Sequence, residues 1–349
     1  MKKQIMLLTL LCSVLAAGCT PSAPLEGGRS PGQDTTAVAH RSIEVFAMDT
    51  VMSLTAYGDN ADAGVAAAKE EIERLEALLA VGSDTGDVKP LNRDRSRTIA
   101  PDTKAILTYV LALNESTGGA FDCTIGTLKK AWGFYKDEYR VPTAEEVRAL
   151  LPQPGQPRLT IEGDTATLAD GARLDLGGIG KGFTSARIIE LFAAHGIESG
   201  IISLGGNVQT LGHKPDGSAW RIGIQDPRDP EALFAIIDTA DEAVITSGGY
   251  QQCFERDGVR YHHIIDPHTG YPAESGLISA TVVSPDGTLA DGLSTALYVM
   301  GTQRAAEYWH DQGKSFDMIL MEDDGNVLIT EGLEGRVVLQ DGGRAEVLR

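Results

Sequence analysis

The chain has 349 residues, of which 42% are hydrophobic and 23% are charged, so it can bury a sizeable core and is not a disordered chain. Its 49 acidic residues outnumber the 30 lysines and arginines, and the net charge of −19 excludes a general attraction to nucleic acid or anionic lipid headgroups. Four cysteines without a C-x-x-C pair exclude a disulfide-framed miniprotein and a cysteine-rich zinc site. A phosphate-handling site in so acidic a chain is expected to recruit a metal cation.

The N-terminal segment has the pattern of a bacterial lipoprotein signal. Two lysines precede an apolar run over residues 5–17, which is too short to span a hydrocarbon core of about 30 Å but suits a signal peptide. Small residues lead directly into Cys19, as in a lipobox. Residues 1–19 therefore predict a signal peptide with lipidation at Cys19, and ordinary cleavage beside an incidental cysteine is the alternative.

The following segment, residues 20–40, is rich in Pro, Gly, Ser and Thr, which predicts a flexible tether. It joins the lipid anchor to a folded domain over residues 41–349. These features predict a protein of the cell envelope, held to a membrane by lipid and facing the periplasm. That compartment allows a disulfide, but the wide separation of Cys123 and Cys253 in sequence favours two buried thiols.

The folded domain mixes helix and strand patterns without a regular alternation. In the first half of the chain, the patterns predict a hairpin over 43–57, helices over 62–80 and 102–116, a capped helix from Thr143 to Leu151, and strands within 158–176. The second half is predicted to begin with a helix over 180–195, followed by mostly strands over 199–284, including one at 261–266. Helices near 288–300 and 302–312 and strands around Asp324-Gly325 complete the prediction. Because a doubly wound parallel sheet needs strands and helices to alternate, we expect an α+β fold with mixed or antiparallel sheets flanked by helices.

A glycine-rich stretch, residues 174–183, leads into the helix predicted at 180. Free backbone N–H groups at such a turn can bind phosphate. The stretch is not a P-loop, because Asp175 and Gly182 stand where that motif has its first glycine and its Ser or Thr, and Phe183 breaks a G-x-G-x-x-G pattern. A glycine-rich helix start with Lys181 at the surface is the alternative reading of this stretch.

The segment ADGLSTAL, residues 290–297, places a carboxylate and hydroxyl groups on a predicted helix. Asp291 and Thr295 are four residues apart and share one face, with Ser294 beside them. Oxygen ligands of this kind suit Mg²⁺, which keeps water and phosphate oxygens among its ligands. A helix cap is the alternative role for Asp291, and as a bare pattern it is the more common one.

The segment YHHIIDPHTGYP, residues 261–272, contains three histidines before and within a predicted turn. On a strand, His262 and His263 point to opposite faces, so at most one lines a given pocket. The spacing lacks H-E-x-x-H, which argues against zinc. A histidine near a metal-bound phosphate can act as general base toward a hydroxyl nucleophile, and a structural role is the alternative.

Eight motifs in this order resemble the ApbE family, the FAD:protein FMN transferases, over about residues 43–301. They are MDT (48–50), GAFDCTIG followed by WGF (119–134), LDLGGIGKGF (174–183), SLGGN (203–207), WRIGIQDP (220–227), TSGGY (246–250), HIIDPHTGYP (263–272) and ADGLSTAL (290–297). The resemblance implies a T-fold-like architecture and roles for individual residues. Asp291, Thr295 and the carbonyl of Gly178 would bind Mg²⁺, and Ser294, a neutral hydroxyl, would act only through water. His263 would be the base or proton shuttle. Eight residues would hold FAD: Met48, Gly119, Ala120, Phe121, Asp122, Asp175, Lys181 and Ile264.

The implied reaction splits FAD at its pyrophosphate, esterifies the FMN half to a Thr or Ser hydroxyl of an acceptor flavoprotein, and releases AMP. In a chain this acidic, Mg²⁺ and Lys181 would compensate the charge of the pyrophosphate, and transfer would depend on positioning and charge neutralisation. The nearest alternative is a hydrolase that splits FAD into FMN and AMP. A flavin-binding lipoprotein without chemistry and a structural envelope lipoprotein are further alternatives.

Overall fold

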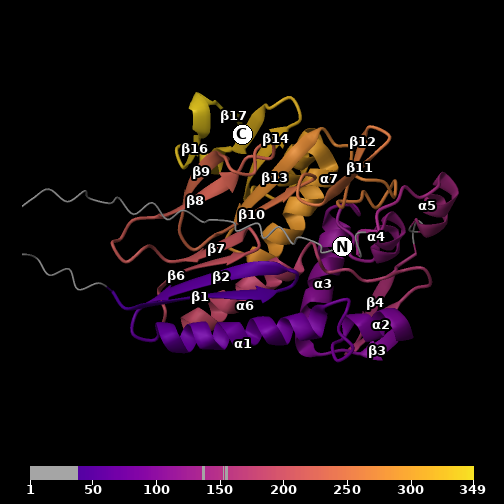
Figure 1. Ribbon diagram of the computed structural model, residues 1–349, viewed down its shortest axis with the longest axis horizontal. Helices are drawn as coiled ribbons and strands as arrows, with labels where there is room; N and C mark the ends of the chain where they lie inside the picture. The colour runs from indigo at the N-terminus through magenta and orange to yellow at the C-terminus, as the bar shows by residue number, and fades with distance from the viewer. Residues whose placement is uncertain (1–37, 136–137, 152, 154–155) are drawn as a thin grey trace, which may run out of the picture. The chain divides into compact units, whose positions relative to one another are not determined.

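A nine-stranded sheet runs through the folded part of the computed structural model (Figure 1). The structure describes residues 38–135, 138–151, 153 and 156–349, so the predicted signal peptide, Cys19 and the tether up to residue 37 lie outside the described residues. Neighbouring strands of this sheet are antiparallel except β15 and β17, which are parallel. In sheet order the strands are β1 (His40–Ala47), β2 (Thr50–Tyr57), β6 (Ser199–Leu204), β7 (Asn207–Leu211), β10 (Ala243–Gly248), β13 (Leu277–Ser284), β14 (Asp317–Glu322), β15 (Val327–Thr330) and β17 (Glu346–Leu348).

Smaller sheets and helices complete the part of the chain that the structure describes. The smaller sheets are β3 (Ser96–Thr98) with β5 (Thr165–Leu168) and β4 (Leu159–Glu162), β16 (Val337–Leu339) with β9 (Leu233–Thr239) and β8 (Trp220–Gln225), and β11 (Cys253–Arg256) with β12 (Val259–His262). The helices are α1 (Ala61–Leu79), α2 (Val88–Asp94), α3 (Pro101–Ser116), α4 (Gly126–Trp132), α5 (Ala144–Leu150), α6 (Gly180–Ala194) and α7 (Gly287–Asp311), with 3₁₀ turns η1 (Glu331–Leu333) and η2 (Gln340–Gly342). The predicted α+β class with sheets flanked by helices is confirmed.

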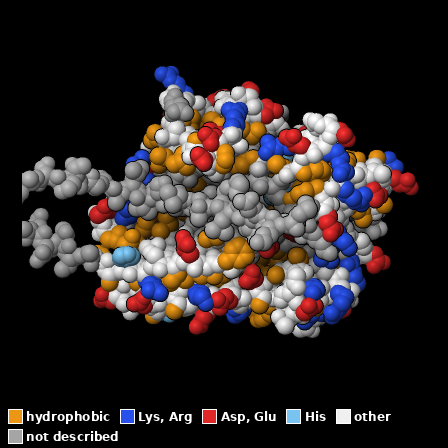
Figure 2. Space-filling view, viewed as in Figure 1, with side chains coloured by type: hydrophobic (Ala, Val, Ile, Leu, Met, Phe, Trp, Pro, Cys, Tyr) orange, Lys and Arg blue, Asp and Glu red, His pale blue; other side chains and the backbone are white. Residues whose placement is uncertain are grey.

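The long helix α1 forms where apolar residues recur at intervals of three and four. This apolar face contains Val65, Ala68, Ile72, Leu75 and Leu79. Its first three residues are buried with β1, β2 and α6, and the two leucines join the core cluster that contains residues of α2 and α3. The opposite face of α1 carries charges such as the ion pair between Lys69 and Glu73. On the face shown in Figure 2, acidic and basic side chains are interspersed rather than gathered in one patch. The predicted helix over 62–80 is thus confirmed within one residue at each end.

The starts of α6 and α7 approach each other closely because both carry glycine at the contact. A Cβ atom at Gly182 would overlap the carbonyl oxygen of Gly287 and the Cβ of Asp291. A Cβ atom at Gly287 would lie 2.7 Å from Ser185 Oγ. Only glycine permits this backbone approach, which brings the glycine-rich stretch of the sequence against the helix that carries Asp291.

Helix α7 contains a break that the sequence patterns anticipate. The two predicted helices, near 288–300 and 302–312, meet at Gly301, whose φ of 76° and ψ of 171° lie outside the helical region. The helix begins at Gly287, and the side chain of Asp286 accepts hydrogen bonds from the backbone N–H groups of Thr288 and Leu289. Asp286 is therefore the cap, and the capping alternative for Asp291 is wrong because Asp291 lies one turn inside the helix.

Short elements account for the differences from the sequence expectations. Helices α2 and α4 have seven residues each, too few for an apolar period to stand out. Strand β7 carries polar residues that are buried by its neighbours, including Asn207 and Gln209. The predicted strand over 261–266 ends at His262, since β12 only pairs with the short β11. Residues 169–176 form no strand of the described sheets, because they follow a turn and lead into α6.

Among the helices that the structure describes, none combines the length and apolar composition needed to cross a bilayer. The two cysteines of the described residues are free thiols: Cys123 is buried, and Cys253 is partly exposed. The expectation of two thiols rather than a disulfide is confirmed, while the burial of Cys253 is incomplete because it lies on the exposed β11–β12 hairpin.

Candidate functional site

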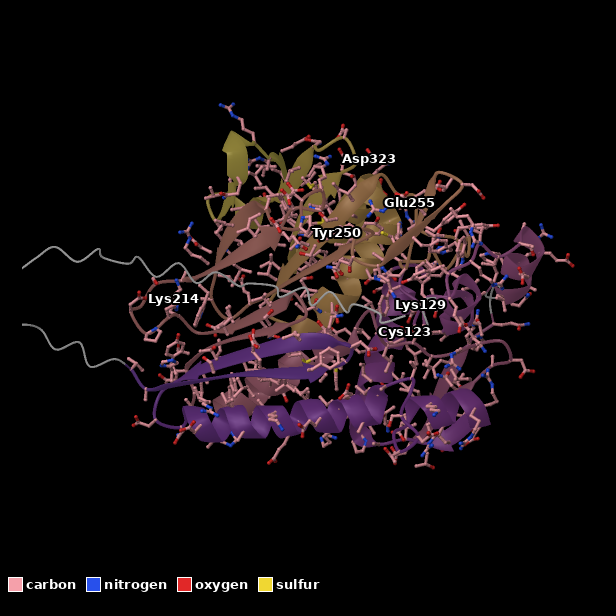
Figure 3. All side chains as sticks on the ribbon, viewed as in Figure 1. Cys123, Lys129, Lys214, Tyr250, Glu255 and Asp323 are labelled. Atoms are coloured by element: carbon pink, nitrogen blue, oxygen red, sulfur yellow. The ribbon has the colours of Figure 1, made fainter. Side chains whose placement is uncertain are left out.

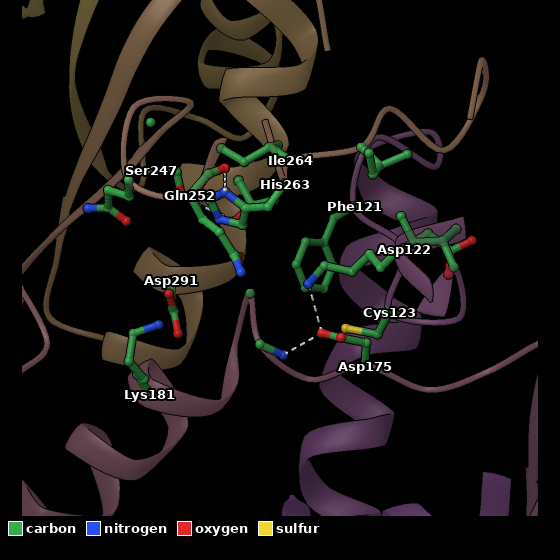
Figure 4. Close-up of a pocket in the computed structure, with 18 of the residues that line it drawn as sticks. Phe121, Asp122, Cys123, Asp175, Lys181, Ser247, Gln252, His263, Ile264 and Asp291 are labelled. Atoms are coloured by element: carbon green, nitrogen blue, oxygen red, sulfur yellow. Dashed lines mark hydrogen bonds and ion pairs between the residues drawn. The ribbon is translucent and has the colours of Figure 1, made fainter. Parts of the chain in front are cut away.

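A cleft of about 270 Å³ lies where the segment after α3, the start of α6, β10 and α7 come together. Figure 4 shows Asp291 and Lys181 on one side of it and Phe121 and Asp175 on the other. Ten of the predicted site residues line this cleft: Ala120, Phe121, Asp122, Asp175, Gly178, Lys181, His263, Ile264, Asp291 and Thr295. Residues distant in sequence are therefore brought together, as the motifs led us to expect.

Asp291 is a buried carboxylate held by neutral groups. Its side chain is 4% exposed. One carboxylate oxygen accepts a hydrogen bond from the backbone N–H of Gly182 at 2.8 Å, and the other accepts one from Asn207 Nδ2 at 2.9 Å. These donors fix the orientation of the carboxylate but carry no charge, so a buried negative charge faces the cleft without a paired cation among its described contacts. Burying such a charge is unfavourable unless a cation compensates it.

Thr295 and Gly178, which line the same cleft as Asp291, carry a hydroxyl oxygen and a carbonyl oxygen. A Cβ atom at Gly178 would lie 3.3 Å from Thr295 Oγ1, so the loop before α6 packs directly against this face of α7. In the described residues no three His, Cys, Asp or Glu side chains form a metal-binding group. A single carboxylate with hydroxyl and carbonyl oxygens is a donor set for a hard cation such as Mg²⁺, which takes its other ligands from water and phosphate. The residues present therefore fit the implied metal.

Three predicted site residues do not line the cleft. Ser294 is fully buried and is not among the lining residues. Gly119 lies in the turn after α3 with a φ of 84°, against the ring of His268. Met48 lies in the β1–β2 turn, where its backbone N–H donates to Glu76 Oε1 at 2.7 Å and its sulfur accepts a hydrogen bond from Thr184. Their predicted contacts with FAD or metal stay predictions.

His263 follows β12 and is fixed by one backbone carbonyl. The backbone N–H of His263 donates to the carbonyl oxygen of Gln252 at 3.0 Å, and Nδ1 of its imidazole ring lies 3.2 Å from the same oxygen. Because a carbonyl only accepts, the ring proton is assigned to Nδ1, which leaves the lone pair on Nε2. Burial, and then the charge of Lys129, lower the pKa of His263 to about 3. His263 is therefore a neutral imidazole with a free acceptor nitrogen. Its neighbour His262 contacts the carbonyl of Ala273 instead and does not line the cleft. Only one of the two histidines thus lines the cleft, as predicted, although His263 lies just beyond the end of β12.

Asp175 forms an ion pair that sequence reasoning missed. Lys129 Nζ on α4 lies 3.0 Å from Asp175 Oδ1, which also accepts the backbone N–H of Gly177 at 2.9 Å. Burial alone would raise the pKa of Asp175, but the charge of Lys129 and the surrounding hydrogen bonds outweigh it and lower that pKa. Both Lys129 and Cys123 line the cleft, and Figure 3 labels both residues on the ribbon. No pattern in the sequence marked Lys129, because it stands on a short helix between two motifs.

The segment after α3 forms another wall of the cleft. Asn114 Nδ2 donates to the carbonyl of Phe121 at 2.7 Å, and Asp122 Oδ1 accepts the N–H and the hydroxyl of Thr124, each at 2.7 Å. These local bonds hold an irregular loop in place. Asn207 and Ser247 also line the cleft. Their motifs, SLGGN and TSGGY, were the signal that could have identified them.

Comparisons with known proteins agree with this geometry. The model of the ApbE family matches residues 48–320. A relative from Treponema pallidum, named FAD:protein FMN transferase, is 32% identical over 316 residues, which is 84% of this chain and 87% of that protein. A protein of the same name from Vibrio cholerae is 37% identical over 231 residues, or 65% of this chain and 69% of that protein.

Solved structures give the same result. The ApbE protein of Thermotoga maritima superimposes with a TM-score of 0.80 at 30% identity and covers 85% of this chain and 99% of its own. The flavinyl transferase ApbE of Pseudomonas stutzeri superimposes with a TM-score of 0.77 at 28% identity and covers 87% of this chain and 98% of its own.

Proposed function

Because this chain belongs to the ApbE family, we propose that it transfers the FMN moiety of FAD to a Thr or Ser hydroxyl of an acceptor flavoprotein and releases AMP. The relatives and solved structures that carry transferase names support the flavin transfer. The observation that carries the chemistry is the buried carboxylate of Asp291, which has no ion pair among its described contacts and lines the same cleft as Thr295, Gly178 and a neutral His263.

Asp291, Thr295 and the carbonyl of Gly178 would hold Mg²⁺, while Gly182 and Asn207 orient the carboxylate. When bound, this ion would neutralise charge on the pyrophosphate oxygens of FAD. Lys181 and Lys129, which both line the cleft, add positive charge. These groups bind and orient the dinucleotide in an otherwise acidic protein.

His263 would receive the proton of the attacking hydroxyl at Nε2. The bond that forms joins the acceptor oxygen to the FMN phosphorus, and the bond that breaks joins this phosphorus to the bridging oxygen, which leaves with AMP. The carbonyl of Gln252 keeps the ring in the tautomer that accepts at Nε2. The lipid anchor at Cys19 would hold the domain at the membrane, facing the periplasm, where acceptor flavoproteins would be reached.

The test is incubation of the purified full-length chain with FAD, Mg²⁺ and a flavoprotein acceptor. In-gel fluorescence and mass spectrometry should find FMN covalently attached to the acceptor and AMP in solution. Free FMN with an unmodified acceptor would instead identify a hydrolase, and recovery of intact FAD would identify a binding protein. Detergent partitioning and mass spectrometry of the N-terminal peptide would test lipidation.

A further inference from the structure

Three hydroxyl groups form a continuous chain between β10 and α7. Ser294 Oγ donates to the backbone carbonyl of Asp291 at 2.8 Å. Ser247 Oγ on β10 lies 2.9 Å from Ser294 Oγ and 3.2 Å from Thr295 Oγ1. This series of hydroxyl groups begins at Thr295, passes through Ser247 and Ser294, and ends at the backbone carbonyl of Asp291. It therefore connects two of the residues that would bind metal.

The Asp291 carbonyl, at the end of this chain of hydroxyl groups, fixes the direction of every hydrogen bond in the series. A carbonyl oxygen only accepts, and each hydroxyl has a single hydrogen to donate. Because the hydrogen of Ser294 goes to the Asp291 carbonyl, the bond between the serines requires Ser247 as donor. Ser247 then has no hydrogen left, so its contact with Thr295 requires the Thr295 hydroxyl as donor.

This direction determines what Thr295 presents to the cleft. With its hydrogen turned toward Ser247, Thr295 Oγ1 offers lone pairs on its remaining sides, one of which faces Gly178. A cation needs lone pairs, and a hydroxyl hydrogen turned toward it would be repelled. We infer that Ser247 is a positioning residue: it accepts the hydrogen bond that Thr295 donates and thereby turns the Thr295 lone pairs toward the cation of the proposed function, on which this inference rests.

Burial favours one direction of the hydrogen bonds along this series of hydroxyl groups. Ser294 is fully buried and Asp291 is 4% exposed, so the reverse direction would give up the hydrogen bond from Ser294 to the Asp291 carbonyl in a place where water does not replace it. A hydrogen bond lost in the interior is unfavourable. The carboxylate of the same residue accepts its own N–H donors from Gly182 and Asn207. The oxygens that face the cleft are therefore arranged before a metal binds.

The experiment measures metal affinity directly, by titrating Mn²⁺ into the full chain with FAD present and following free Mn²⁺ by electron paramagnetic resonance. Ser247→Ala should weaken Mn²⁺ binding by about five- to tenfold, the effect of one hydrogen bond. Ser294→Ala should weaken it as well, because Ser247 is then free to donate to Thr295. Ser247→Thr keeps the hydroxyl and should restore the affinity.

Thr281→Val is the matched control, since Thr281 on β13 forms a similar hydroxyl pair at 2.8 Å with Thr246 on β10, outside this chain of bonds. It should lower the melting temperature without changing Mn²⁺ affinity. The inference is overturned if the folded Ser247→Ala and Ser294→Ala variants bind Mn²⁺ like the unmodified protein. Should Ser247→Ala not fold, Ser294→Ala and Ser247→Thr decide the question. Asp291→Asn separates the two proposals: unchanged Mn²⁺ affinity in that variant removes the metal site itself, whereas lost affinity there with normal affinity in Ser247→Ala removes only the positioning role.

Discussion

Lys129 and Asp175 are joined by an ion pair of 3.0 Å within the cleft, although 46 residues separate them in the chain. Lys129 also acts on His263, because its positive charge contributes to the low pKa of that histidine. A single side chain on a short helix therefore influences both the carboxylate expected to contact FAD and the expected base.

We expect Lys129→Met to reduce flavin transfer at least tenfold, because it leaves Asp175 buried without its counter-charge. Lys130→Met is the matched control: Lys130 is the next residue, is exposed, and does not line the cleft. Rates of in-gel flavin labelling, measured with the melting temperature of each variant, distinguish the two. Equal rates in both variants would argue against a role for the ion pair.

Asp291→Asn should abolish flavin transfer while the fold persists, because the amide keeps the shape of the side chain but not its charge. Asp286→Asn is the control on the same helix, since Asn also caps helices well and Asp286 does not line the cleft. Circular dichroism checks the fold, and labelling of the acceptor checks the activity. Retained turnover in Asp291→Asn would remove this residue from the metal assignment.

Removal of divalent cations should stop the reaction without unfolding the protein. We expect excess EDTA to abolish labelling, and added Mg²⁺ or Mn²⁺ to restore it. Gly182 and Asn207 hold the carboxylate of Asp291 through protein hydrogen bonds, so we expect the far-ultraviolet circular dichroism spectrum not to change. Full activity in EDTA would contradict a metal-dependent mechanism.

The low pKa of His263 predicts a specific loss of stability in acid. Its folded pKa is about 3, below the usual value of 6.5, so the unfolded chain binds a proton first. The stabilisation is complete above about pH 6.5 and is lost as pH falls toward 3, by at most about 1.4 kcal/mol per pH unit. His263→Gln should reduce this slope in urea unfolding between pH 6.5 and 4. A slope that is the same in both proteins would show that His263 is not held neutral by the fold.

Gly182→Ala should destabilise the protein by about 1–3 kcal/mol, because the added methyl group would overlap Gly287 and Asp291. Gly180→Ala, two residues earlier, is the control: its Cβ would have no atom within 4 Å, and alanine favours a helix. Urea unfolding of both variants gives the comparison. A neutral effect at Gly182 would mean that α6 and α7 can separate at little cost.

The sequence was most informative where a pattern is long. The hairpin, the capped helix at Thr143 and the two halves of α7 follow from local periodicity and turn chemistry. The contact between the Gly178 loop and Asp291 followed from resemblance, because residues 113 positions apart share no local pattern. The roles of Lys129 and Ser247 depend on which elements pack together, and their short segments gave no period from which this packing could be inferred.

The break at Gly301 divides α7 into two helical segments. The first contains Asp291 and Thr295, and the second packs Tyr308 and Trp309, whose indole N–H donates to the carbonyl of Phe316 at 2.7 Å. A displacement of one part of a helix is transmitted to the other part through the continuous backbone hydrogen bonds. The non-helical backbone of Gly301 interrupts these hydrogen bonds. Insertions or fusions at the exposed end of α7, residues 311–315, should therefore leave the register of the cleft intact, which makes this end a suitable place to attach a reporter.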